Sequence, residues 1–256
     1  MPVHFILLIL IILTLNCLAG FFIAKRIRKL ENIRKDFIAN VSHELRTPIT
    51  SIKGFTETLL DGDLDDKEEV RHFLEIIRKH SDRLNAIIED LLSLSRIEQD
   101  SKNIKFMQCK IISILENAIE ICRIKAAEKN ITIETYADRT LKSKINPSLV
   151  EQAVVNLIDN AIKYSNDGTK IIVRLYKENK NIVISVEDFG CGIKEKHLSR
   201  LFERFYRVDK ARSRKQGGTG LGLSIVKHIA EIHKGSVAVK SELEKGSTFF
   251  IKLAIS

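Results

Sequence analysis

The chain of 256 residues has no tryptophan, only 3 prolines and only 12 glycines. This composition excludes collagen-like and low-complexity chains, which are rich in glycine and proline. The 4 cysteines form no C-x-x-C pair and no cluster with histidine at metal-ligand spacing. We interpret them as reduced thiols that pack as small hydrophobic side chains. With 44% hydrophobic and 29% charged residues, the chain is neither disordered nor a polytopic membrane protein.

Positive charges outnumber negative charges by 9, but the excess lies in two segments. Residues 25–36 hold six basic and two acidic side chains, and residues 200–215 hold seven basic and two acidic ones. Together these segments account for the whole net charge. We therefore expect two local roles for the basic residues and no direct binding of nucleic acid.

One long apolar run, from Phe5 to Ala24, carries no charged residue. As a helix it would match the ~30 Å hydrocarbon core of a bilayer. Basic residues follow the run and do not precede it, which argues against a signal peptide and predicts a cytoplasmic C-terminal part. We expect residues 1–24 to be one N-terminal transmembrane helix in the inner or plasma membrane, followed by a basic juxtamembrane linker helix at 25–36.

The next segment has the apolar spacing of two amphipathic helices, at about 26–60 and 67–99. Residues 61–63 are suited to a turn, and Asp65 and Asp66 are suited to cap the second helix. A single hairpin leaves parts of both apolar stripes uncovered. We therefore expect an all-α dimerisation hairpin that forms a four-helix bundle in a homodimer.

Beyond residue 102, helical and strand-like segments are mixed. Helices are expected at about 111–129, 147–164 and 221–232, and strands at 131–136, 170–177, 181–188, 236–242 and 248–254. Because strands and helices do not alternate strictly, we expect a C-terminal α/β sandwich in which helices cover one mixed sheet.

The first group suited to chemistry lies at residues 42–48. On a helix, His43, Glu44 and Thr47 would lie on adjoining parts of one face. Pro48 removes the helical partner of the Glu44 carbonyl, so we expect a bend just after His43. Glu44 could orient a nucleophilic imidazole or accept its proton. Threonine at position 47 excludes the H-E-x-x-H zinc motif.

Two further groups are suited to a metal ion and an adenine base. Asn156, Asn160 and Lys163 would share one helical face, where amide oxygens suit Mg²⁺ and the ammonium suits a phosphate. Asp188 ends a strand and could accept a hydrogen bond from an adenine amino group, while the glycines at 190–192 let the base approach the backbone.

A glycine-rich run at 217–222 precedes a helix. Its backbone N–H groups would form a cradle for phosphate. The run is not G-x-G-x-x-G and lies outside a βαβ unit, which argues against a dinucleotide site.

These groups, in this order, resemble the sequence boxes of two-component sensor histidine kinases. The similar segments are 37–48 (phosphoacceptor box), 156–164 (N box), 188–192 (G1 box), 202–206 (F box) and 217–222 (G2 box). The narrower resemblance is to sensor kinases of the phosphate-regulon type. The resemblance implies a dimerisation and histidine phosphotransfer domain at 37–102 and a catalytic ATP-binding domain at 103–256, an α/β sandwich of the histidine kinase/Hsp90-like ATPase type.

The resemblance implies a protein-histidine kinase that uses ATP and Mg²⁺ to phosphorylate itself on His43. The phosphoryl group would pass to an aspartate of a response regulator, with regulator phosphatase activity beside it. Glu44 would act as base, Thr47 would position water for dephosphorylation, and Asn156 and Asn160 would hold Mg²⁺. Related ATPases have glutamate at the position of Asn156 to activate water, so transfer to histidine is favoured over hydrolysis.

Residues 193–219 would form a mobile ATP lid that turns the second basic segment toward the triphosphate, and the sequence does not choose between Arg204 and Arg207 as the phosphate contact. The nucleotide contacts that the resemblance implies are Asn156, Asn160, Lys163, Tyr164, Asp188, Gly190, Gly192, Arg204, Arg207, Gly218, Thr219, Gly220, Leu221 and Gly222.

Two alternatives stay open at this point. One is a scaffold that binds partners but not ATP, against which Asn160, Asp188 and the glycine run argue. The other is a regulator phosphatase with vestigial kinase activity. Only 12 residues separate Ala24 from Phe37, too few for the usual relay modules. Either the anchor or a partner senses the stimulus, or the chain is a fragment of a longer kinase.

Overall fold

The structure is a computed structural model, and it describes the chain except residues 1, 63–65, 100–103, 210–217 and 255–256. Among the helical residues, the side chains of 2–17, 19, 29, 30, 33 and 34 also lie outside the description. The chain divides into two compact units, residues 1–80 and residues 81–256. The division falls inside the second helix, and each unit is considered by itself.

The first unit is helical. Helix α1 (Pro2–Asp61) is followed by the first part of α2 (Lys67–Gln99). The two helices contact each other through the rings of Phe55 and Phe73, whose centroids lie 5.5 Å apart. Asp66 caps α2 by accepting hydrogen bonds from the backbone N–H groups of Glu68 and Glu69. The predicted helical hairpin is therefore confirmed, while Asp63 of the predicted turn and the expected cap Asp65 lie outside the described residues.

Pro48 lies inside α1, which continues to Asp61. Proline has no backbone N–H group to donate to the preceding turn. Two nearby hydroxyl side chains donate to backbone carbonyls in the same region of the helix. The Thr47 hydroxyl donates to the His43 carbonyl at 3.1 Å, and the Ser51 hydroxyl donates to the Thr47 carbonyl at 3.2 Å. The segment that contains His43 therefore remains helical on both sides of the proline.

The expected transmembrane segment, Phe5–Ala24, lies within α1. Most of its side chains are outside the described residues. In the part of the chain that is described, no helix has the length and apolar character needed to cross a membrane.

The second unit contains a mixed five-stranded sheet in the order β2-β4-β5-β7-β6. The strands are β2 (Thr132–Ala137), β4 (Lys170–Glu178), β5 (Asn181–Asp188), β6 (Ser236–Glu242) and β7 (Gly246–Ala254). The pair β2 and β4 is parallel, and the other three pairs are antiparallel. β5 is buried along nearly its whole length because it lies in the middle of the sheet, whereas the edge strand β6 has no fully buried residue.

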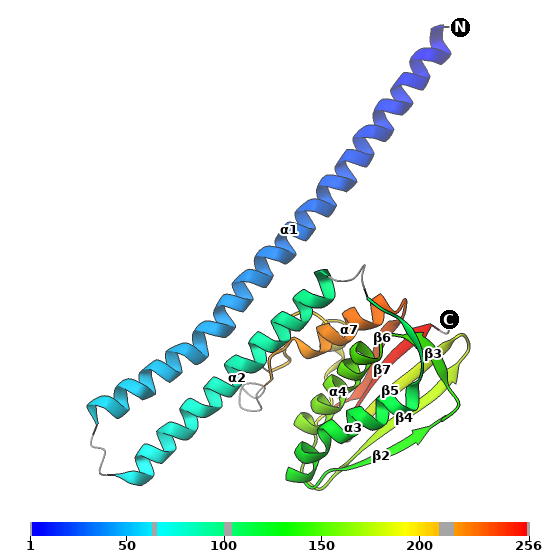
Figure 1. The fold of residues 1–256 in the computed structure, drawn as a ribbon. Coiled ribbons are helices and arrows are strands. Elements are labelled where there is room, and N and C mark those ends of the chain that lie inside the picture. The colour runs from blue at the N-terminus through cyan, green and yellow to red at the C-terminus, as the bar shows by residue number, and fades with distance from the viewer. Residues whose placement is uncertain (1, 63–65, 100–103, 210–217, 255–256) are drawn as a thin grey trace. The chain divides into compact units, whose positions relative to one another are not determined.

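Three long helices pack on the sheet: α3 (Ile111–Glu128), α4 (Pro147–Tyr164) and α7 (Gly222–Ile232). Figure 1 shows these helices together on one face of the sheet. Their contact with the sheet is apolar, with Ile158, Ile184 and Ile225 fully buried. The predicted α/β sandwich with one mixed sheet is thus confirmed.

Three short elements were absent from the sequence prediction. A two-stranded ribbon joins β1 (Met107–Lys110) and β3 (Lys142–Ile145), and a single helical turn forms α5 (Glu195–Leu198). Segments of four residues are too short for a periodic pattern to distinguish strand from helix.

The start of α4 is fixed by Asn146 and His233. The Asn146 side chain accepts a hydrogen bond from the backbone of Leu149, and Pro147 follows it at the first helical position. The backbone N–H of Asn146 donates to His233 Nε2 at 3.0 Å, while His233 Nδ1 donates to the Ile229 carbonyl at 2.7 Å. Burial lowers the pKa of His233, against the opposing hydrogen bond to Ile229. His233 is therefore a neutral structural imidazole.

We expect acid to destabilise the second unit through His233. Because its pKa is lower in the folded protein than the ordinary value of 6.5, the unfolded chain binds more protons as the pH falls through this range. The stabilising contribution is complete above about pH 6.5 and decreases below it. Urea unfolding at several pH values should show that His233→Gln removes this part of the pH dependence. Equal pH dependence in both proteins would contradict the assignment.

Candidate nucleotide-binding site

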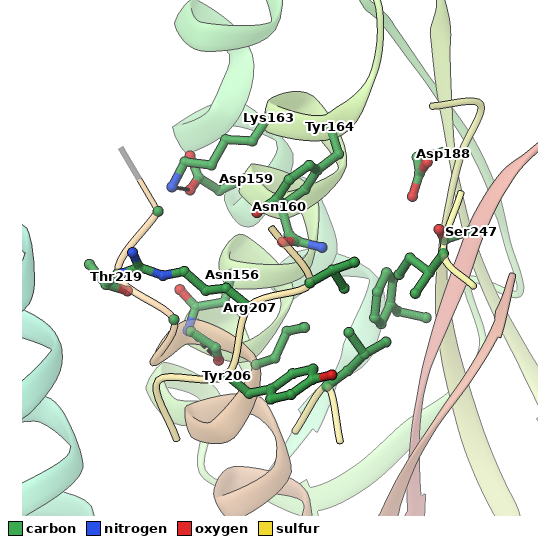
Figure 2. Close-up of a pocket in the computed structure, with 18 of the residues that line it drawn as sticks. Asn156, Asp159, Asn160, Lys163, Tyr164, Asp188, Tyr206, Arg207, Thr219 and Ser247 are labelled. Atoms are coloured by element: carbon green, nitrogen blue, oxygen red, sulfur yellow. Dashed lines mark hydrogen bonds and ion pairs between the residues drawn. The ribbon is translucent and has the colours of Figure 1, made fainter. Parts of the chain in front are cut away.

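The second unit contains a cavity of about 610 Å³. Volumes of this size are typical of sites for small molecules and cofactors. Its walls come from α4, the N-terminal end of α7, the segments that follow β5 and the second half of α2. Figure 2 shows the polar side chains that face this cavity. The sequence-predicted residues that line it are Asn156, Asn160, Lys163, Tyr164, Asp188, Gly192, Arg207, Gly218, Thr219, Gly220 and Gly222.

Helix α4 supplies one polar face of the cavity, with Asn156, Asn160 and Lys163 at intervals of about one helical turn. The Lys163 ammonium pairs with Asp159 at 2.6 Å, and Lys125 from α3 donates to the other oxygen of Asp159 at 2.8 Å. Burial alone would raise the pKa of Asp159, but the charges and hydrogen bonds of Lys163 and Lys125 outweigh it and lower the pKa. Asp159 is thus held ionised and fixes Lys163 at the cavity wall.

Asp188 lies at the end of β5 and is 4% exposed. Its carboxylate accepts a hydrogen bond from the backbone N–H of Gly190 at 3.0 Å and another from the backbone of Ser247. Burial raises the pKa of Asp188 to about 6 despite these two hydrogen bonds. At neutral pH the carboxylate is a charged acceptor in a partly dry site, where a donor from a ligand is strongly bound.

The glycines after β5 are required by close backbone packing. A Cβ at Gly190 would lie 2.2 Å from the Tyr164 carbonyl oxygen, so this residue supports the loop although it does not line the cavity. Gly192 has a φ of 65°, and its Cβ would lie 2.0 Å from the Glu242 carbonyl oxygen. Both positions therefore admit only glycine without movement of the backbone.

The two candidate lid arginines have different surroundings. Arg207 lines the cavity, where Figure 2 shows it with Thr219 and Asn156, and its Nε would lie 3.1 Å from a Cβ at Gly220. Arg204 is not among the lining residues and forms an ion pair with Glu98 of α2. The structure thus favours Arg207 as the arginine that faces a ligand. Within the expected lid at 193–219, residues 210–217 lie outside the described residues.

The glycine-rich segment joins the cavity to the N-terminus of α7. Gly220 has a φ of 79°, and its carbonyl accepts a hydrogen bond from Phe205 at 2.8 Å. The Thr219 hydroxyl accepts from the backbone N–H of Leu221 at 3.2 Å. Leu221 itself is fully buried and does not line the cavity. It anchors the segment, while Gly218, Thr219 and Gly220 face the cavity.

The residues expected to carry the phosphoryl group lie in the other unit, on α1. His43 is exposed, and Glu44 and Thr47 are partly buried beside it along the helix. The exposed imidazole is accessible to a reactant, as a nucleophile must be.

Asp90 and Lys125 also line the cavity, and the sequence motifs did not include them. Lys125 lies on the polar side of α3, and Asp90 is an acidic residue within the apolar pattern of α2. A carboxylate within an apolar helical stripe is a signal that could have identified Asp90, since such a group is costly to bury without a partner.

The cavity suits a nucleotide and Mg²⁺. Its volume, the buried acceptor Asp188 and the cations Lys163 and Arg207 at its wall fit a base and phosphates. The described residues contain no group of three or more His, Cys, Asp or Glu side chains that could hold a metal. Mg²⁺ commonly takes few protein ligands and binds with substrate phosphates and water, and the amide oxygens of Asn156 and Asn160 are of the ligand type that it prefers.

Two domain families match the chain. Residues 33–100 match the His Kinase A (phospho-acceptor) domain, and residues 145–256 match the family described as histidine kinase-, DNA gyrase B- and HSP90-like ATPase. A phosphoacceptor domain followed by this ATPase domain supports a protein-histidine kinase.

The chain is also similar to individual sensor kinases. It is 39% identical over 225 residues to sensor protein SrrB of Staphylococcus aureus strain NCTC 8325, a match that covers 88% of this chain and 38% of SrrB. The chain therefore spans well under half the length of the curated relatives it matches. Together with the two domains, this similarity supports a two-component sensor histidine kinase. These comparisons do not support the narrower phosphate-regulon type.

Solved structures have the same fold. The structure of ShkA in complex with AMPPNP is similar with a TM-score of 0.61 and 25% identity, covering 85% of this chain and 46% of ShkA. Histidine kinase ThkA in complex with response regulator protein TrrA gives a TM-score of 0.71 at 23% identity, covering 90% of this chain and 64% of ThkA. The latter likeness concerns the fold alone.

Substitution at Gly192 should reveal how strongly the loop after β5 is constrained. We expect Gly192→Ala to lower the free energy of unfolding by about 1–3 kcal/mol, because the new Cβ forces a strained backbone to move. Gly222→Ala is the matched control, since its Cβ would meet Asn156 only at ordinary distances of 3.8 Å or more. Urea denaturation would measure both, and equal stability of the two variants would contradict the packing argument.

Proposed function

We propose that the chain is a membrane-anchored sensor histidine kinase that binds Mg-ATP, phosphorylates His43 and passes the phosphoryl group to an aspartate of a response regulator. The observation that carries this proposal is the cavity, where Asn156, Asn160, Asp188 and the glycine-rich segment converge. These residues come from separate parts of the sequence and have complementary roles toward one nucleotide.

Each part of the nucleotide has a suitable partner. The Asp188 carboxylate would accept from the adenine amino group, and Gly192, which lines the cavity, would shape the pocket for the base. Lys163 and Arg207 would bind phosphate oxygens together with the N–H groups at residues 218–222. Bound Mg²⁺ would lower the charge on the phosphates, and the amide oxygens of Asn156 and Asn160 would hold it.

The proposed transfer ends on His43. One nitrogen of the imidazole attacks the γ-phosphorus, and an N–P bond forms while the bond from phosphorus to the β–γ bridging oxygen breaks, leaving ADP. Glu44 accepts the proton of the other ring nitrogen. Asn156 has no proton-accepting carboxylate, which supports transfer to histidine over attack by water. Positioning and charge stabilisation then supply most of the catalysis.

We propose a response regulator as the partner and a second activity toward it. ThkA, whose fold this chain shares, has been solved in complex with a response regulator, and residues 33–100 of the present chain match a phosphoacceptor domain. Thr47 lies one turn from His43, where its hydroxyl could position water against the phosphorylated regulator. Regulator phosphatase activity would use this residue.

The dimer and the membrane anchor are also proposals. Ile38, Ile49 and Leu74 are more than half exposed in the single chain, and burial of such residues against a second copy would complete a four-helix bundle. The uncharged run Phe5–Ala24 and the basic residues after it support a single-pass anchor with the kinase part in the cytoplasm.

The role of His43 is tested by His43→Gln. We expect this variant to lose autophosphorylation from γ-labelled ATP completely, because the acceptor nitrogen is gone, while nucleotide affinity stays within about twofold. The wild-type label should be acid-labile and alkali-stable. Persistence of such label in the variant would refute His43 as the acceptor, and loss of nucleotide binding would refute the separation of roles.

Asp188 should give nucleotide binding a dependence on pH. The folded protein holds a proton on this carboxyl up to about pH 6, so the charged acceptor is present above that pH and lost below it. We expect affinity to fall about tenfold when the carboxylate is protonated, since its hydrogen bond is then no longer charge-assisted. In Asp188→Asn the affinity should be low throughout, and its ratio to wild type should approach one below pH 6. Calorimetry with ADP measures both, and a constant ratio would contradict the assignment.

A further inference from the structure

The second half of α2 packs closely within the ATP-binding unit. Ile87, Leu94 and Ile97 are buried there, at most 4% exposed. The side chain of Gln152 on α4 donates to the Ser93 hydroxyl at 2.6 Å, and Glu98 pairs with Arg204. This part of the helix is therefore seated on the domain by both apolar and polar contacts.

Asp90 lies in the middle of this seated segment and reaches the proposed nucleotide site. Its carboxylate accepts a hydrogen bond from the Thr219 hydroxyl at 2.6 Å. Thr219 belongs to the glycine-rich segment and is 9% exposed. The hydroxyl has one proton to donate, so while Asp90 accepts it the hydroxyl has no proton for a phosphate oxygen.

The electrostatic setting makes this contact sensitive to a phosphate. Burial raises the pKa of Asp90, while the hydrogen bond from Thr219 and the charge of Lys163 oppose the shift. The ionised form of Asp90 is thus stabilised by Thr219 and Lys163, and Lys163 is also suited to bind a phosphate. A phosphate group beside it would compete for both partners and repel the like charge, since such repulsion is weakly screened in a partly buried site.

We propose that Asp90 is a nucleotide-sensing residue, which holds α2 to the glycine-rich segment through Thr219 in the absence of a nucleotide and is released when the phosphates of a nucleotide enter. The proposal rests on the proposed nucleotide binding and identifies the residue that couples it to α2. The coupling is reciprocal: if a bound nucleotide weakens the contact between Asp90 and Thr219, then removal of that contact strengthens nucleotide binding by the same free energy. Asp90 is thus a positioning residue for α2.

The test compares Asp90→Asn with Asp82→Asn. Both changes remove one negative charge from α2, but Asp82 is exposed and does not line the cavity. Titration with a fluorescent Mg-ATP analogue should show about five- to tenfold tighter binding for Asp90→Asn and unchanged binding for Asp82→Asn. Adenosine has no phosphate, so its affinity should be the same in all three proteins.

Hydrogen exchange supplies a second readout, which can be measured in the wild-type chain as well as in the variant. In the wild-type chain, Mg-ATP should increase amide exchange over residues 86–97, and adenosine should not. In Asp90→Asn, exchange over these residues should already be increased without a ligand. Unfolding curves would verify that both variants fold.

The outcomes separate this proposal from the proposed function. If wild type and Asp90→Asn bind Mg-ATP equally, or if the variant binds it more weakly, the sensing role is wrong while nucleotide binding stands. If exchange over residues 86–97 does not respond to Mg-ATP, release of α2 is wrong. If the wild-type chain binds neither ATP nor adenosine, both proposals fail together.

Discussion

The amphipathic character of α4 is the constraint on which the rest of the second unit depends. One side of the helix is buried in the core through residues such as Val154, Leu157 and Ile158. The opposite side presents Asn156, Asn160 and Lys163 to the cavity. Both sets of side chains belong to one rigid helix. The close packing of the core therefore fixes the helix and, with it, the positions of the polar groups at the cavity.

The cavity controls its charge through pairing and burial. Asp159 lies between Lys163 and Lys125, and its pKa is lowered. Among the described residues no lysine pairs with Asp188, and burial raises its pKa to about 6. The two carboxylates lie in one cavity but have opposite shifts. This separation suits the proposed nucleotide site, where Asp159 would orient a cation and Asp188 would accept from a neutral hydrogen-bond donor.

The glycine-rich segment connects several elements at one point. Gly220 accepts a backbone hydrogen bond from Phe205, Thr219 donates to Asp90, and Leu221 is buried beneath them. A ligand that changes the position of this segment therefore acts at once on the chain around Phe205 and on α2. Such a junction of backbone and side-chain contacts is a physical basis for coupling a binding site to a neighbouring helix.

The sequence by itself determined the longer regular elements, the mixed sheet and a set of polar residues that the fold brings to one cavity. Periodicity and short motifs are local, and α4 and β5 carry their signals within a few residues. Only the tertiary structure separated Arg207 from Arg204, showed that Gly190 and Leu221 support the site without lining it, and brought Asp90 to Thr219. These facts depend on contacts between residues such as Asp90 and Thr219 that lie far apart in the chain, which no local pattern encodes. The short ribbon of β1 and β3 was decided by pairing for the same reason, because four residues acquire a strand conformation only from their partner.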